Sequence, residues 1–176
     1  MKLDIISRER LTNGFLKVDV LRILLPNQKE IIREVIQKRD GVAILAITKE
    51  GDIFLTKQPR AGINNLNSIE IPAGLLEEGE NPEVSAEREL LEETVCVLTK
   101  KLISLGKYVA DPACSTSVMH LYLALQVEKR YEQNLDSDEY LECFTKPIST
   151  VYRMLETGEI MDANSIIALE RAKKFL

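Results

Sequence analysis

The densest group of side chains able to do chemistry lies in residues 74–94, where eight of twenty-one residues are glutamates. A helix over the second half of this segment would place Glu89 and Glu93 one turn apart, with Glu92 on the same face. These like charges repel one another, and Arg88, four residues before Glu92, offsets only part of the repulsion. A hard divalent cation would offset far more, because Mg²⁺ favours carboxylate oxygens together with substrate phosphate oxygens. The pattern therefore favours a magnesium site that faces a phosphorylated substrate.

The alternative is a solvated acidic helix face, which describes most runs of charge. What favours the metal site is the whole arrangement of a short strand, a glycine, an acidic loop and then a helix. The strand covers 68–71 and ends in Pro72-Ala73-Gly74. Asn81 suits the N-cap and Pro82 the first helical position, so we expect the helix to run from there to about Thr94.

The rest of the chain predicts a mixed sheet between helices. Strand patterns cover 15–36 (with a turn at 25–28), 42–47, 53–55, 68–71, 102–109, 118–127 and 141–144, and two further helices cover 148–156 and 163–175. Strands interleaved with one central and two terminal helices are typical of an α+β fold.

Length and composition fit one compact soluble domain of 176 residues. Lys and Arg number 23 against 28 Asp and Glu, and this net charge of −5 disfavours nucleic acid as a partner. The apolar runs are too short to span a membrane, and the first residues lack a signal-peptide core. Three cysteines without ligand-like spacing indicate a reducing compartment, so we expect a cytoplasmic protein.

The acidic segment resembles the Nudix box: Gly, five residues, Glu, seven residues, Arg-Glu, an aliphatic, any residue, Glu-Glu, any residue, Gly, an aliphatic. The positions in register are Gly74, Glu80, Arg88, Glu89, Leu90, Glu92 and Glu93. Val95 stands where the box has its final glycine. If that glycine closes the helix in the left-handed conformation, valine is a poor substitute, because β-branching makes a positive φ costly. We therefore expect a rebuilt helix end.

The resemblance implies a Nudix-type α/β/α sandwich with a mixed sheet and an N-terminal antiparallel strand extension. It also implies a hydrolase that uses Mg²⁺, with Mn²⁺ as a substitute. Glu89 and Glu93 would be the main metal ligands, assisted by Glu92 and by the Ala73 carbonyl. Arg88 would orient these acids by ion pairing. The bound metal would polarise a pyrophosphate and activate the attacking water.

Further segments are similar to ADP-ribose pyrophosphatases: 33–36, 68–74, 110–113 and 158–165. Pro112, sixteen residues beyond Cys96 at the end of the box, is the mark of that subfamily. Asp111 and Ala113 depart from its Ser-Pro-Gly motif. The resemblance implies hydrolysis of ADP-ribose to AMP and ribose 5-phosphate.

Substrate contacts implied by the resemblance involve Arg33, Glu34, Arg60, Leu75 and Pro112. Arg60 would lie near the phosphates, and Arg33 and Glu34 near the adenine or terminal ribose. The alternatives are a surface cation and an ordinary exposed strand pair. Glu139, with Asp138 as second choice, would be the base or a further metal-site acid, and the alternative there is an exposed acidic turn.

Two other functions remain open. One keeps the chemistry and changes the substrate to a GDP- or UDP-hexose, and the other is a Nudix-fold sensor that binds ADP-ribose without cleaving it. We expect residues 1–38 to form a strand extension that mediates a homodimer, and residues 39–176 to form the hydrolase domain. The partner otherwise expected is a small nucleoside diphosphate, with neither nucleic acid nor membrane.

Overall fold

The computed structural model describes residues 3–14, 16–130 and 141–176. The chain divides into two compact units, one made of residues 1–40 and 108–118 and the other of residues 41–107 and 119–176. Each unit is described in turn.

The first unit is a three-stranded antiparallel sheet in the order β1-β2-β3. Its strands are β1 (Asp4–Asn13), β2 (Lys17–Leu24) and β3 (Glu30–Gln37). The strands predicted between residues 15 and 36 are confirmed, and the turn before β3 closes with a bond from the Gln28 N–H to the Leu25 carbonyl at 2.9 Å. The end of β3 is bonded to the loop after residue 110, because the Ile36 N–H donates to the Cys114 carbonyl at 2.7 Å.

The second unit is built on a mixed sheet in the order β12-β5-β4-β10-β9. Its strands are β4 (Gly41–Ile47), β5 (Asp52–Arg60), β9 (Ile103–Val109), β10 (Val118–Leu125) and β12 (Glu142–Pro147). Strand β10 is parallel to β4, whereas β12 is antiparallel to β5. Two further strands extend the sheet, β6 (Asn65–Glu70) beside β5 and β7 (Ala73–Leu75) beside β4. A separate pair is formed by β8 (Cys96–Val97) and β11 (Glu128–Lys129).

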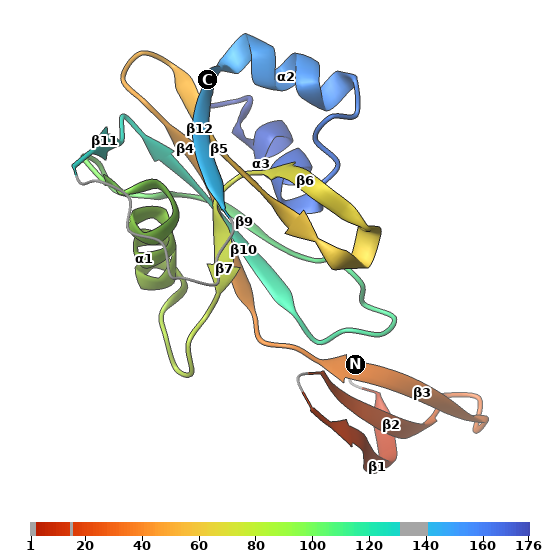
Figure 1. Cartoon of the computed structure of the whole chain (residues 1–176). Helices are drawn as coiled ribbons and strands as arrows, with labels where there is room; N and C mark the ends of the chain where they lie inside the picture. Colours follow the sequence, from red (N-terminus) through yellow and green to blue (C-terminus); the bar gives the residue numbers. More distant parts are fainter. Residues whose placement is uncertain (1–2, 15, 131–140) are drawn as a thin grey trace. The chain divides into compact units, whose positions relative to one another are not determined.

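Among residues 3–14, 16–130 and 141–176, the helices that cover this sheet are α1 (Pro82–Thr94), α2 (Ile148–Glu156) and α3 (Ala163–Ala172). Both α1 and α3 pack on β4, and Figure 1 shows α1 on one side of the sheet and α2 and α3 on the other. All seven residues of β4 are buried, as expected for a strand covered on both faces. The predicted α/β/α sandwich is therefore confirmed.

The apolar face of α1 fixes its position on the sheet. Ala86 and Leu90 are fully buried and pack in one cluster with Val42, Ile44 and Ala46 of β4. Because these residues hold the helix in place, the acidic residues between them lie at a defined position beside β7. Within the described part of the chain, none of the helices combines the length and apolarity needed to cross a membrane.

Candidate active site

The acidic helix α1 begins where the sequence predicts. The Asn81 side chain accepts the Glu83 N–H at 2.8 Å, and Pro82 occupies the first helical position. This cap satisfies one of the N–H groups that a helix leaves free at its start. The helix ends at Thr94, so the glutamates of the box share one continuous element.

The expected rebuilding of the helix end is wrong. Val95 adopts the left-handed conformation with φ 54° and ψ 22°, and its N–H closes the helix onto the Leu91 carbonyl at 2.9 Å. A β-branched residue is disfavoured there, because its side chain crowds the backbone at positive φ. The Val95 side chain is buried, and that apolar burial offsets the backbone cost. The exit from the helix therefore keeps a glycine-like geometry without a glycine.

Glu89 lies directly against the backbone of Gly74. A Cβ atom added at Gly74 would lie 1.9 Å from the Glu89 carboxyl carbon and 2.0 Å from one of its oxygens. Glu89 is buried, and burial raises the pKa of its carboxyl while the Arg88 guanidinium lowers it. A buried carboxylate beside bare backbone is a position where a bound cation would be stabilised strongly.

Arg88 holds the acidic residues together. Its guanidinium donates to Glu80 at 2.9 and 3.1 Å, to Glu89 at 2.8 Å, to Glu92 at 3.0 Å and to the Leu75 carbonyl at 3.2 Å. The hydrogen bond to Glu80 is the main reason that the pKa of Arg88 is raised. One planar side chain thus contacts two glutamates of the helix and anchors the preceding loop.

Glu80 joins the loop between β7 and α1 to the Arg88 guanidinium. The Arg88 hydrogen bond, followed by the Glu77 N–H at 2.9 Å, lowers the pKa of Glu80 to about 2. The Glu80 N–H in turn donates to the Glu77 carbonyl at 3.1 Å. The loop between β7 and α1 is therefore closed by its own backbone and tied to the helix by one ionised carboxylate.

Glu93 connects the helix to the end of the preceding strand. Its carboxylate accepts the Ala73 N–H at 3.0 Å. Ala73 and Gly74 in turn pair with Ala43 and Val42 of β4. The pairing with the central strand places the Ala73 backbone beside Glu93, next to the carboxylates that the sequence assigns to a metal.

These residues fit a hard divalent cation. Among the described residues, no three His, Cys, Asp or Glu side chains form a ready-made metal cluster. Glu89 and Glu92 instead accept hydrogen bonds from Arg88, and Glu93 accepts one from the Ala73 N–H. The available donor atoms are all oxygens, which is the ligand type that Mg²⁺ prefers. Glu89 and Glu93 lie one helical turn apart, so their carboxylates share one face of the helix. Binding the cation would require Glu89 and Glu92 to exchange Arg88 for the metal.

Arg60, at the end of β5, is not a free surface cation. Its guanidinium donates to both carboxylate oxygens of Glu70 on β6, at 2.8 and 2.5 Å, and Glu70 is buried. The hydrogen bond to Glu70 raises the pKa of Arg60, and the charges of Asp162 and Glu93 add to that effect. Arg60 is therefore fixed in orientation and lies within the electrostatic field of the acidic helix.

Glu70 and Asp162 are the site residues that sequence reasoning missed. Glu70 stands two residues before Pro72 in the segment compared with ADP-ribose pyrophosphatases, and Asp162 directly precedes α3. An aspartate directly before a helix was a readable N-cap signal. The pairing of Glu70 with Arg60 had no sequence signal, because the two residues meet only when β5 and β6 pair.

Three predicted substrate residues belong to the first unit. Arg33 and Glu34 are exposed on β3, where the Arg33 guanidinium donates to the Ile32 carbonyl at 2.8 Å. Pro112 lies in the loop whose Cys114 is bonded to β3. Leu75, in the second unit, is half-buried in β7 and offers its carbonyl to Arg88. Glu139 and Asp138 lie outside the described residues.

The chain is similar to known proteins along most of its length. The NUDIX domain family model matches residues 37–164. The chain is 34% identical to an ADP-ribose pyrophosphatase of Bacillus subtilis (strain 168), over 94% of this chain and 89% of that protein. It is 32% identical to a methanol dehydrogenase activator of Bacillus methanolicus, with the same coverage. A GDP-mannose pyrophosphatase of Escherichia coli O9:H4 (strain HS) is 32% identical over 78% of this chain and 75% of its own length.

A solved structure described as an ADP compounds hydrolase has the same fold. Its TM-score is 0.86 at 22% identity, and the match covers 100% of this chain and 95% of that one.

Proposed function

Since the chain belongs to the Nudix family and is a pyrophosphohydrolase of that family, we propose that it hydrolyses ADP-ribose to AMP and ribose 5-phosphate with Mg²⁺ as cofactor. The observation that carries the proposal is the Glu89 carboxylate packed against Gly74, next to Glu93 at the strand end. Two of the acids expected to hold the metal thus lie at the backbone of one strand end.

In this reaction water adds to one phosphorus of the diphosphate, the bridging P–O bond breaks, and the bridging oxygen leaves with the other phosphate. Glu89 and Glu93, assisted by Glu92 and the Ala73 carbonyl, would hold the cation. When bound, Mg²⁺ supplies charge that stabilises the reacting phosphate and promotes ionisation of water. Before the cation binds, Arg88 keeps Glu89 and Glu92 oriented through the contacts described above.

Arg60 is the protein's own cation for the substrate. Two of its guanidinium nitrogens, Nε and Nη2, donate to Glu70. Because the guanidinium is planar, this pairing also fixes the direction of the third nitrogen, Nη1. A guanidinium fixed in this way can contact a phosphate oxygen without losing side-chain entropy on binding. Leu75, Arg33, Glu34 and Pro112 complete the proposed substrate contacts, and Glu139 is proposed as the additional acid.

The choice of ADP-ribose rests on the Bacillus subtilis relative, which spans nearly the whole chain. A nucleoside diphosphate hexose is the second candidate, because the GDP-mannose pyrophosphatase is almost as similar over three quarters of the chain. A binding protein without catalysis is disfavoured, since Glu89, Glu92 and Glu93 are all retained.

A substrate panel tests the proposal. We expect kcat/KM with Mg²⁺ to be higher for ADP-ribose than for GDP-mannose or UDP-glucose, with ADP a poor substrate and EDTA abolishing turnover. Chromatography should identify AMP and ribose 5-phosphate as the products. A preference for a hexose derivative would replace the substrate while keeping the chemistry. Failure to cleave any member of the panel with Mg²⁺ or Mn²⁺ would reject the function.

We also propose that the first unit mediates a homodimer. Every residue of β1 is exposed, including Ile5, Ile6 and Leu11, and Ile32 of β3 is exposed as well. Apolar groups on an open sheet are commonly covered by a partner. Sedimentation at micromolar concentration should give twice the monomer mass, and a stable monomer would contradict this. The free cysteines, Cys96, Cys114 and Cys143, fit the proposed cytoplasmic location.

A further inference from the structure

The chain changes its neighbour in the sheet between β6 and β7. Strand β6 pairs with β5 and ends at Glu70, whereas β7 begins at Ala73 and pairs with β4. Ile71 and Pro72 carry the chain from one neighbour to the other. Ile71 is fully buried, so its backbone N–H needs an acceptor beyond the end of the β5–β6 ladder.

That acceptor is the side chain of Ser165 on α3. The Ser165 hydroxyl oxygen accepts the Ile71 N–H at 2.9 Å and donates its own hydrogen to the Asp162 carboxylate at 2.8 Å. Ser165 is fully buried, so water does not compete for this bond. On the other side of the same peptide, the Thr56 hydroxyl donates to the Glu70 carbonyl at 3.4 Å. The peptide between Glu70 and Ile71 is therefore held at both of its polar groups.

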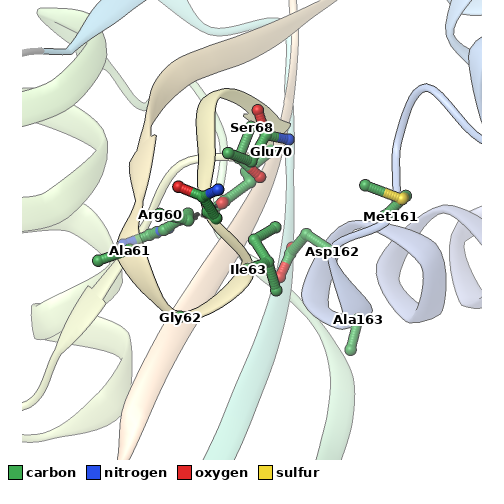
Figure 2. Close-up of a pocket in the computed structure, with 11 residues that line it drawn as sticks. Arg60, Ala61, Gly62, Ile63, Ser68, Glu70, Met161, Asp162 and Ala163 are labelled. Carbon is green, nitrogen blue, oxygen red and sulfur yellow. Dashed lines mark hydrogen bonds and ion pairs between the residues drawn. The ribbon is translucent and has the colours of Figure 1, made fainter.

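The start of α3 does not need the Ser165 hydroxyl. Asp162 is the N-cap of the helix, and its carboxylate accepts the Ser165 N–H at 2.9 Å. Figure 2 shows Asp162 at the start of α3, on the side of the β5–β6 hairpin. Because the backbone bond already caps the helix, the hydroxyl is free to join α3 to the sheet through Ile71.

The crossing segment leads directly to the acids of the proposed metal site. The Pro72 carbonyl accepts an N–H of β4 at 2.9 Å, and the Ala73 N–H donates to Glu93 at 3.0 Å. The segment is thus held by Ser165 of α3 and by Glu93 of α1, two helices on opposite sides of the sheet (Figure 1). Proline fixes its own φ and restricts the residue before it, so the placement of Ile71 is passed on to Ala73.

We propose that Ser165 is a positioning residue for the metal site. By holding the Ile71 N–H it fixes the Ala73 backbone, whose carbonyl is a proposed metal ligand, beside Glu93. Ser165 itself contacts neither the metal nor the substrate. Without the hydroxyl, a buried N–H would lose its acceptor, and the segment would shift to relieve that cost. The inference rests on the proposed function and extends the site to a helix on the far side of the sheet.

The test removes the hydroxyl oxygen alone. Ser165→Ala deletes the acceptor of the Ile71 N–H and keeps the backbone bond that caps α3. Tyr152→Phe is the matched control, because the Tyr152 hydroxyl donates to the Leu169 carbonyl of the same helix at 2.8 Å, away from the crossing segment. Thermal unfolding shows that each variant is folded and how much stability each has lost.

Amide hydrogen exchange, followed by NMR without metal or substrate, measures the positioning directly. The reference is the Val95 N–H, which closes α1 onto Leu91. Relative to this reference, exchange at Ile71 and Ala73 should become about tenfold faster in Ser165→Ala, which is about 1.4 kcal/mol. In Tyr152→Phe the ratio should stay within about twofold. Unchanged exchange at Ala73 in Ser165→Ala would overturn the proposal.

Titration with Mn²⁺ in the absence of substrate, followed by electron paramagnetic resonance, measures the effect on the metal site. The Kd of Mn²⁺ should rise about tenfold in Ser165→Ala and stay within about twofold in Tyr152→Phe. The Mg²⁺ concentration that gives half of the maximal rate should rise by the same factor, and saturating Mg²⁺ should restore kcat. Equal changes of Kd in the two variants would make Ser165 a purely structural residue and overturn the proposal.

Ser165→Cys is the second variant, because it keeps nearly the same volume and replaces the oxygen by a weak acceptor. It should change exchange and Mn²⁺ affinity in the same direction and by less, and it replaces Ser165→Ala if that variant does not fold. Wild-type values for both quantities in Ser165→Cys would then overturn the proposal. If the wild-type protein binds Mn²⁺ but cleaves no nucleoside diphosphate sugar, the proposed function fails and the titration still tests Ser165. If it binds no Mn²⁺, the metal site and the role of Ser165 are both rejected.

Discussion

Gly74 is required by the Glu89 carboxylate and not by its own backbone. Its φ lies outside the positive range in which Gly51, Gly79 and Gly158 are found. A Cβ at Gly74 would instead lie within 2.2 Å of three carboxyl atoms of Glu89. The box glycine therefore leaves space for the Glu89 side chain, which we propose as a metal ligand.

Gly74→Ala should reduce kcat by about a hundredfold, the effect of moving a catalytic group by roughly 1 Å. Alanine can adopt the backbone conformation of Gly74 without strain, so we expect the large loss of rate to be accompanied by only a small fall in Tm. Gly14→Ala is the control, because nothing lies within 4 Å of a Cβ at that exposed position. Steady-state kinetics and thermal unfolding are the measurements. A normal rate in Gly74→Ala would show that Glu89 can be displaced without consequence.

Glu93→Gln should nearly abolish turnover, because it removes a charge from the proposed metal site, and Glu89→Gln should act in the same way. The two losses should not add in the double variant, since both residues serve one unit. Glu87→Gln, exposed on the same helix, should keep its activity. Titration with Mn²⁺ should show weaker metal binding in parallel with each loss of rate. Additive losses, or a near-normal rate in Glu93→Gln, would refute the metal assignment.

Glu80 predicts a specific dependence of stability on pH. Its pKa is lowered from 4.5 to about 2, chiefly by the hydrogen bond from Arg88. The ionised carboxylate therefore stabilises the fold fully above pH 4.5, and this contribution is lost as the pH falls towards 2. Glu80→Gln should lower the free energy of unfolding at neutral pH, and its difference from wild type should shrink on acidification. Urea denaturation at a series of pH values measures this. A difference that stays constant with pH would mean that ionisation of Glu80 does not stabilise the fold.

The helix and its acidic face could be predicted because their causes are local. Asn81 and Pro82 mark the start of α1 within the sequence itself, and the spacing of the glutamates follows from helical geometry. Strand β1 lies within the predicted extension of residues 1–38, but no strand pattern was recognised over its own residues, because all of them are exposed and no buried alternation marks them. The register that pairs Thr56 with Glu70, and so brings Glu70 to Arg60, depends on tertiary packing.

The geometry of the helix end was mispredicted because it depends on two opposing contributions to stability, the cost of a positive φ and the gain from burial of the side chain. Local sequence shows the cost of a β-branched residue at positive φ, but not the burial that compensates it. Val95 is only 7% exposed, which the sequence alone could not establish. Tertiary burial here overrides a backbone preference, as it often does for local propensities.

Because of this balance, the stabilities of the alanine and glycine variants at residue 95 should have the reverse of their usual order. Val95→Ala and Val95→Gly both lose the buried methyl groups, but only glycine is free of the cost of about 1–2 kcal/mol for a left-handed L-residue. The glycine variant should therefore be more stable than the alanine variant by about 1 kcal/mol. At Glu87, exposed within α1, the order should be opposite, with alanine favoured by about 1 kcal/mol. Urea denaturation of the four variants measures both differences. If alanine were as stable as glycine at residue 95, the left-handed closure onto Leu91 would not be the conformation that the protein adopts in solution.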